Sequence, residues 1–137
     1  MNWKRFLVAF VVVLVVTAAA NFVIHGSLLH EDYARYPNLL RPEADANAHA
    51  PFLLLAFAAF ALGFTLIWGL WMPPYSSPVR AGVFYGAVVW LIASVSRYFV
   101  YYAVQPWGME VIRRQIGYEL VWLVVTGAVL GLVYRKA

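Results

Sequence analysis

The sequence predicts an all-α protein, a four-helix transmembrane bundle with a short helical outer loop. Of its 137 residues, 64% are hydrophobic and only 12% are charged, whereas a soluble domain has about 25% charged residues. Four apolar segments are each long enough to cross a bilayer. They are continuously apolar and do not alternate as barrel strands do, which indicates helices.

The four predicted spans are rich in Leu, Val, Ala and Phe, and cover residues 6–24, 51–72, 81–104 and 115–134. All four belong to one integral membrane domain, residues 1–137, because the chain is too short for a second domain. Lys4-Arg5, the apolar run 6–16 and the small residues 17–20 form a pattern that a secretory signal also has. We expect the first span to be retained as a helix.

The outer loop, residues 26–50, is the one sizeable segment outside the predicted spans. Four apolar or aromatic residues in it recur at helical spacing and predict a short interfacial helix: Leu28, Leu29, Tyr33 and Tyr36. We expect Pro37 to end this helix. Pro42 is then suited to open a new helix with Glu43 and Asp45 in its first turn. That helix is expected to run, with a kink, through Pro51 into the second span.

The distribution of charge predicts the orientation of the chain. If the first span starts inside, one side of the membrane receives five basic residues and no acidic ones: Lys4, Arg5, Arg80, Arg135 and Lys136. The other side receives all six acidic residues with four arginines: Arg35, Arg41, Arg113 and Arg114. The positive-inside rule therefore places both termini in the cytoplasm. The net charge of +4 reflects this topology, and nothing in it indicates nucleic-acid binding.

Small residues four apart predict close helix–helix contacts within the bundle. Such pairs occur on the second, third and fourth spans: Ala59 and Gly63, Gly82 and Gly86, Gly127 and Gly131. A dedicated dimer face is the alternative explanation.

The most unusual residue is Arg97, which lies well inside the third span. An unpaired arginine at membrane depth costs roughly 2.5–3.5 kcal/mol on insertion scales. On a regular helix, Gly86, Ala93, Arg97 and Tyr101 fall within about 40° of one another. This predicts that Arg97 faces small neighbours and points into the bundle.

Other polar residues are expected at a similar depth. Glu119 lies about one turn inside the outer end of the fourth span, and Asn21 and His25 share one face of the first. An ion pair between Arg97 and Glu119 is the simplest way to keep both charges there. It could serve only to fix helix register. Alternatively, these residues and Tyr101 form an outward-facing polar pocket, in which Arg97 holds an anionic or carbonyl-bearing group and Glu119 is its counter-ion.

A metal site is a weaker hypothesis. The chain has no cysteine, so thiolate sites and disulfides are excluded. His25, His30, His49 and Asp45 are expected near the outer face, and a set of imidazoles with a carboxylate can bind Zn or Cu. Their spacing matches no metal motif, so solvated loop histidines are the expectation. The sequence leaves the cofactor unknown: haem stays open, because His or Met could ligate it, although only His25 lies near a span. No catalytic motif indicates an enzyme.

A resemblance to known proteins rests on four features: the segment Asn21-Phe-Val-Ile-His25-Gly26, the polar loop with its tyrosines, Trp107-Gly108 and the acid of the fourth span. In this organisation the chain resembles small four-helix bacterial inner-membrane proteins of uncharacterised families. The resemblance implies a multi-pass protein of the bacterial inner membrane. It implies no activity and no site residues.

The leading hypothesis is therefore a non-enzymatic membrane protein whose periplasm-facing pocket binds a small ligand, a lipid headgroup or a partner subunit. Two alternatives stay open. One is a proton-coupled transporter of a small solute that acts as a homo-oligomer, with Glu119 as the titrating group. The other is an accessory subunit of a larger membrane complex, respiratory or photosynthetic. In each case the lipid bilayer is the first partner.

Overall fold

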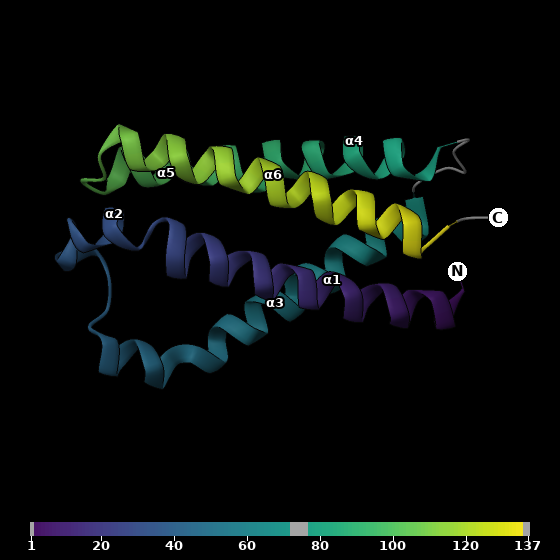
Figure 1. The fold of residues 1–137 in the computed structure, drawn as a ribbon, viewed down its shortest axis with the longest axis horizontal. Helices are drawn as coiled ribbons and strands as arrows, with labels where there is room; N and C mark the ends of the chain where they lie inside the picture. The colour runs from purple at the N-terminus through teal and green to yellow at the C-terminus, as the bar shows by residue number, and fades with distance from the viewer. Residues whose placement is uncertain (1, 72–76, 136–137) are drawn as a thin grey trace.

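The computed structural model describes residues 2–71 and 77–135. Four of its helices are long and apolar enough to cross a membrane, which confirms the all-α four-helix bundle (Figure 1). The end of the predicted second span at Met72, most of the turn that follows it and Lys136 lie outside the described residues.

The long helices run as follows, two of them with a π-helical segment: α1 (Trp3–Val23) continuing into η1 (Ile24–Leu28), α3 (Glu43–Trp71), α4 (Pro78–Trp90) continuing through η3 (Leu91–Val95) into α5 (Ser96–Val104), and α6 (Met109–Val133). The outer loop contains the short helix α2 (His30–Ala34) and one 3-10 turn, η2 (Pro37–Leu39). The loop is thus helical as expected, although Pro37 opens a turn and does not end α2.

The helices begin where local chemistry favours a start. α3 begins at Glu43, directly after Pro42, and passes through Pro51; its first turns lie at an angle to the rest (Figure 1). α4 begins with Pro78 at its first position. α6 begins at Met109, earlier than the expected Gln115, because extended Gly108 precedes it and Glu110 lies in its first turn.

Helices α4 and α6 pack closest, through glycines. A Cβ on Gly127 would overlap the carbonyl of Gly82, and one on Gly131 would overlap the carbonyl of Pro78. Gly86 has the same relation to Leu123. The small-residue pairs of the third and fourth spans are therefore contacts within the bundle. Gly63 of the second span has no such neighbour.

Helix α3 packs on the bundle with only one half. In its second half, Phe60 contacts Trp122 of α6, and the Tyr85 hydroxyl of α4 donates to the Phe64 carbonyl at 2.8 Å. Its first half diverges from the other helices (Figure 1). The side chains of residues 52–55 are consequently exposed, in a part of α3 that is apolar.

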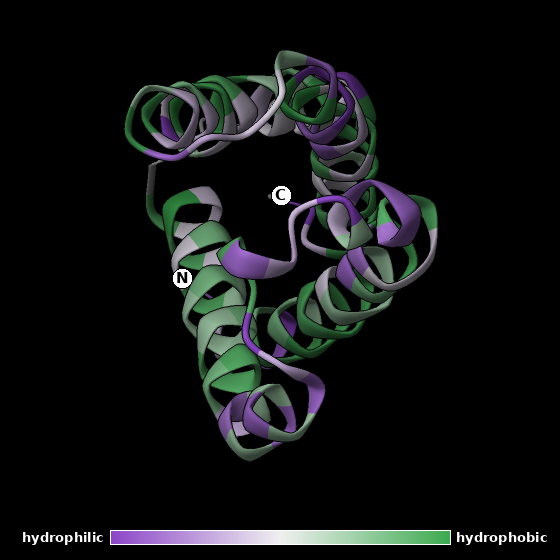
Figure 2. Cartoon of the chain, turned by 90° about the vertical axis from the view of Figure 1, so that its left-hand side faces the viewer, coloured by the Kyte–Doolittle hydropathy of each residue, from purple (hydrophilic) through white to green (hydrophobic). Residues whose placement is uncertain are grey.

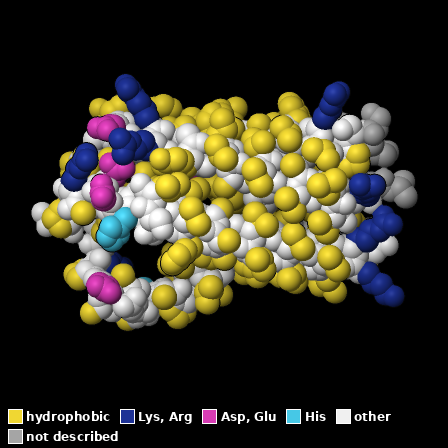
Figure 3. Space-filling model, in the orientation of Figure 1, with side chains coloured by type: hydrophobic (Ala, Val, Ile, Leu, Met, Phe, Trp, Pro, Cys, Tyr) yellow, Lys and Arg dark blue, Asp and Glu magenta, His cyan; other side chains and the backbone are white. Residues whose placement is uncertain are grey.

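The two ends of the bundle differ in charge (Figure 3). The end with both termini carries the described basic residues Lys4, Arg5, Arg80 and Arg135. We call it the basic end. The opposite end, with α2 and the α5–α6 connection, carries acidic residues together with several arginines, and is called the acidic end. Figure 2 views the molecule from the acidic end, where hydrophilic segments lie at the near ends of the helices and in the loop.

Candidate functional site

Glu119 lies at the centre of a polar cluster inside the bundle, near the acidic end. Its side chain is buried, and three neutral donors reach its carboxylate. Oε2 accepts from Ser94 Oγ at 3.1 Å and from Trp122 Nε1 at 2.9 Å, and Oε1 accepts from the Tyr98 hydroxyl at 3.0 Å. An ionised carboxylate only accepts hydrogen bonds, so this arrangement suits a charged Glu119.

Two groups approach Glu119 Oε1 from the side. Arg97 NH2 and His25 Nε2 both lie 3.5 Å from that oxygen. The Arg97 guanidinium also lies 4.9 Å from the centroid of the Tyr98 ring. Arg97 and Glu119 are therefore neighbours, as the sequence indicated.

The orientation of Arg97 differs from the prediction. Its side chain is 45% exposed, whereas Ser94 and Tyr98 take the inward positions. The cause is η3, the π-helical segment Leu91–Val95. In a π-helix the carbonyl of residue i bonds to the amide of residue i+5, one residue further along than in an α-helix. The extra residue rotates the side chains that follow it to a different face of the helix. The prediction that Arg97 points into the bundle is wrong: it lies at the edge, with its guanidinium beside Glu119.

A second polar chain joins the outer loop to Glu119. Gln115 Nε2 donates to the Tyr33 hydroxyl at 3.0 Å, and that hydroxyl lies 2.5 Å from His25 Nδ1. Burial raises the pKa of Tyr33, so its hydroxyl stays protonated and can donate a hydrogen bond to His25 Nδ1. The other ring nitrogen of His25, Nε2, faces Glu119.

The polar pocket is a hollow of about 540 Å³ above Glu119 at the acidic end. It collects all five predicted site residues, and five other polar or aromatic side chains join them. The five predicted residues are Asn21, His25, Arg97, Tyr101 and Glu119; the others are Tyr33, Tyr98, Gln105, Trp107 and Gln115. Tyr101 packs edge-on against Tyr98, and Asn21 Nδ2 donates to the Thr17 carbonyl.

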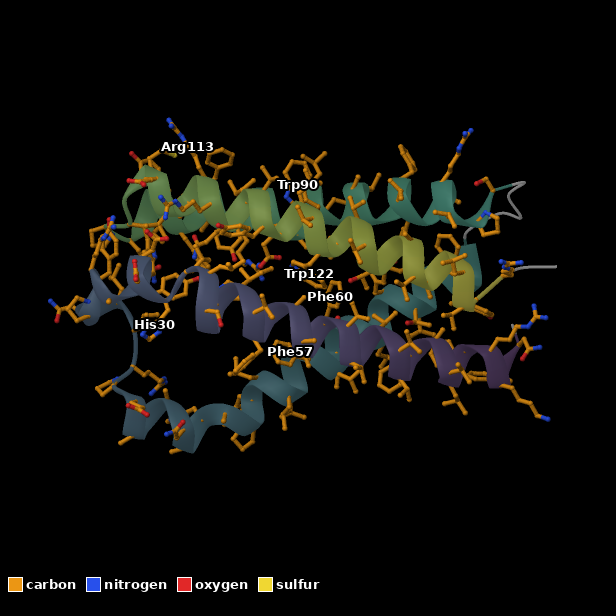
Figure 4. All side chains as sticks on the ribbon, in the orientation of Figure 1. His30, Phe57, Phe60, Trp90, Arg113 and Trp122 are labelled. Carbon is orange, nitrogen blue, oxygen red and sulfur yellow. The ribbon has the colours of Figure 1, made fainter. Side chains whose placement is uncertain are left out.

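A second hollow, the α1–α3 cleft, measures about 600 Å³ and is mostly apolar. Its lining residues come from both helices: Ala18, Asn21, Phe22, His25, Gly26, Leu53 and Phe57. Asn21, His25 and Leu53 line the polar pocket as well, so the two hollows meet there. The divergence of α3 opens this region on the face shown in Figure 3, and Figure 4 places Phe57 in it.

Of the four metal candidates, the structure brings only Asp45 and His49 together. His30 is exposed at the acidic end (Figure 4), and His49 lies in the first turns of α3, with Nδ1 3.2 Å from Asp45 Oδ1. His25 faces Glu119 instead. Among residues 2–71 and 77–135, no three histidine or acidic side chains are grouped closely enough to hold a metal ion.

A partly buried ion pair, which the sequence did not predict, holds the loop on α6. Asp32 of α2 is 2% exposed, and Arg114 NH1 of α6 lies 2.9 Å from its Oδ2. Arg114 NH2 also lies 2.9 Å from Glu110 Oε1. Nothing in local spacing reveals a pair 82 residues apart. Its effect is to hold α2, and with it Tyr33, over the polar pocket.

No known protein family, curated protein or solved structure matches this chain.

Proposed function

We propose that this multi-pass membrane protein is not an enzyme and that its polar pocket binds a small ligand through Arg97. The position of Arg97 carries the proposal. Among the described residues, its guanidinium makes an ion contact of 3.5 Å and a cation–π contact, and no hydrogen bond. Glu119 already accepts from three neutral donors. Arg97 therefore keeps donors for a ligand at the pocket lining.

A second polar atom supports the same conclusion. Gln115 lines the pocket, is 5% exposed, and its Oε1 has no hydrogen-bond partner among the described residues. A buried acceptor without a partner costs about 1–3 kcal/mol. If the Gln115 amide turns toward the pocket, a donor group of a ligand would satisfy this oxygen, while Arg97 would bind an acceptor of the same ligand.

We further propose that the acidic end faces the periplasm of a bacterial inner membrane and that both termini are cytoplasmic. The separation of charge between the two ends supports this orientation. A ligand would then reach the pocket from outside the cell or from the outer leaflet.

Transport by a homo-oligomer is less well supported. Between Glu119 and the basic end, the buried side chains of α6 include Leu123, Thr126 and Leu130, and none of the described ones is charged. A proton-coupled path needs titratable or hydrated groups along its length. Membership of a larger membrane complex remains compatible with the pocket, with a partner subunit in the place of the ligand.

Arg97→Gln tests the proposal. We expect wild-type protein, released from membranes in mild detergent, to retain a small molecule that native mass spectrometry detects as added mass. Arg97→Gln should lose most of it, because a bound acceptor loses its charged donor. The matched control is Arg113→Gln, since Arg113 is exposed and points away from the bundle (Figure 4).

If Arg97→Gln and Arg113→Gln carry the same added mass as wild type, the assignment of Arg97 as the ligand-binding residue is wrong. A stoichiometric protein of larger mass in place of a small molecule would favour the complex-subunit alternative.

A further inference from the structure

The two hollows differ in chemistry and lie next to each other. The α1–α3 cleft is lined by apolar side chains such as Phe22 and Phe57, and it shares Asn21, His25 and Leu53 with the polar pocket. Each volume lies within the range of about 300–1,000 Å³ that is usual for ligand sites. A molecule that fills both needs a polar head and an apolar chain.

The cleft is also accessible from the bilayer. The first half of α3 diverges from the bundle, and Leu53 is 59% exposed although it lines both hollows. An apolar chain can therefore enter sideways from lipid. A water-soluble ligand would gain nothing from this apolar extension.

The charges around the pocket select the headgroup. Arg97 and Glu119 are its two charged lining residues, and they cancel. An anionic head would have to approach Arg97 beside the Glu119 carboxylate, which lies 3.5 Å from the guanidinium and repels a second negative charge. A neutral head meets no such repulsion.

The hydrogen-bonding groups narrow the headgroup further. Arg97 supplies donors, whereas Gln115 Oε1 is a buried acceptor without a partner among the described residues. A hydroxyl group both accepts and donates, and an ester carbonyl accepts. A head with both groups suits the two residues together.

We propose that the ligand is a neutral single-chain lipid with a hydroxyl-bearing headgroup, of the monoacylglycerol class, with its chain in the α1–α3 cleft and its head in the polar pocket. This inference rests on the proposed function, because it names the ligand class of the same pocket.

The test uses monooleoylglycerol with a photoreactive diazirine in its chain, added to the full-length protein in phosphatidylcholine nanodiscs. We expect cross-links to map near Phe22, Leu53 or Phe57. Unlabelled monooleoylglycerol should compete roughly tenfold better than oleate, a difference of about 1.4 kcal/mol. Glycerol, which is the headgroup without a chain, should not compete at the same concentration.

Leu53→Trp should reduce cross-linking several-fold, because the larger side chain fills the junction of the two hollows. Leu54→Trp is the matched control, since Leu54 is similarly exposed on α3 and lines neither hollow. Wild-type competition remains decisive even if Leu53→Trp does not fold.

Preference for oleate over monooleoylglycerol would overturn the neutral headgroup. Competition by glycerol, or cross-links spread evenly over the lipid-facing surface, would overturn the lipid ligand. In these cases, a small molecule that copurifies with wild type but not with Arg97→Gln would still support the proposed function. If the molecule stayed bound to Arg97→Gln, the proposed function itself would be wrong.

Discussion

Gly127→Ala is expected to destabilise the protein by about 3 kcal/mol, the upper part of the usual cost of overpacking a close contact. The added Cβ would overlap the backbone carbonyl of Gly82 across the α4–α6 interface. Backbone cannot rotate away as a side chain can, so the helices must separate. Unfolding in mixed micelles of increasing dodecyl sulfate, followed by tryptophan fluorescence, measures the change.

Gly117→Ala is the control on the same helix, because nothing lies within 4 Å of a Cβ at that position. Alanine favours a helix over glycine by up to about 1 kcal/mol. Gly117→Ala should therefore be as stable as wild type or slightly more stable. Equal stability of the two variants would show that α4 and α6 do not pack through these glycines.

Glu119→Ala is expected to cost about 3 kcal/mol, because each buried donor that loses its acceptor costs about 1–3 kcal/mol. The substitution leaves the donors of Ser94, Tyr98 and Trp122 without their acceptor, and Arg97 without its counter-ion. The same unfolding measurement applies. The expected loss is of the same size as that of Gly127→Ala, although the two act on different parts of the bundle.

Glu110→Ala provides the comparison for Glu119. Glu110 also lies on α6 and contacts Arg114, but its side chain is 66% exposed. Exposed ion pairs contribute about 0–1 kcal/mol. If Glu119→Ala unfolded no more easily than Glu110→Ala, the Glu119 cluster would not stabilise the fold, and its hydrogen bonds would need another explanation.

The spans and the helix starts followed from local chemistry. Continuous apolar segments, Pro42 before Glu43, and the glycines of α4 and α6 are signals that neighbouring residues carry. The proximity of Arg97 and Glu119 followed as well, because two charges at one depth in an apolar environment each need a partner.

The details of the site did not follow from local chemistry. The π-helical segment η3 shifts the inward face to Ser94 and Tyr98, and its sequence Leu-Ile-Ala-Ser-Val does not differ from an ordinary apolar helix. Tyr33 and Asp32 come from the loop and meet Gln115 and Arg114 of α6. Such contacts depend on how the helices pack, and the hydrophobic periodicity of the sequence does not determine that packing.

A pocket near Arg97 and Glu119 that binds a ligand must be open to water from the acidic end. Because the chain has no cysteine, single cysteines can test this directly. Asn21→Cys places a thiol where the polar pocket meets the α1–α3 cleft. Val23→Cys places one on the same helix, closer to the acidic end, at an exposed residue that lines neither hollow.

Both variants are treated in intact cells with a charged, membrane-impermeant methanethiosulfonate reagent, which reacts with hydrated thiols. We expect Asn21→Cys to be labelled from outside, much faster than Val23→Cys. Prior binding of the pocket ligand should slow the labelling of Asn21→Cys. Labelling of Asn21→Cys only after the cells are opened would contradict the orientation. Absence of labelling at Asn21→Cys under both conditions would contradict the pocket.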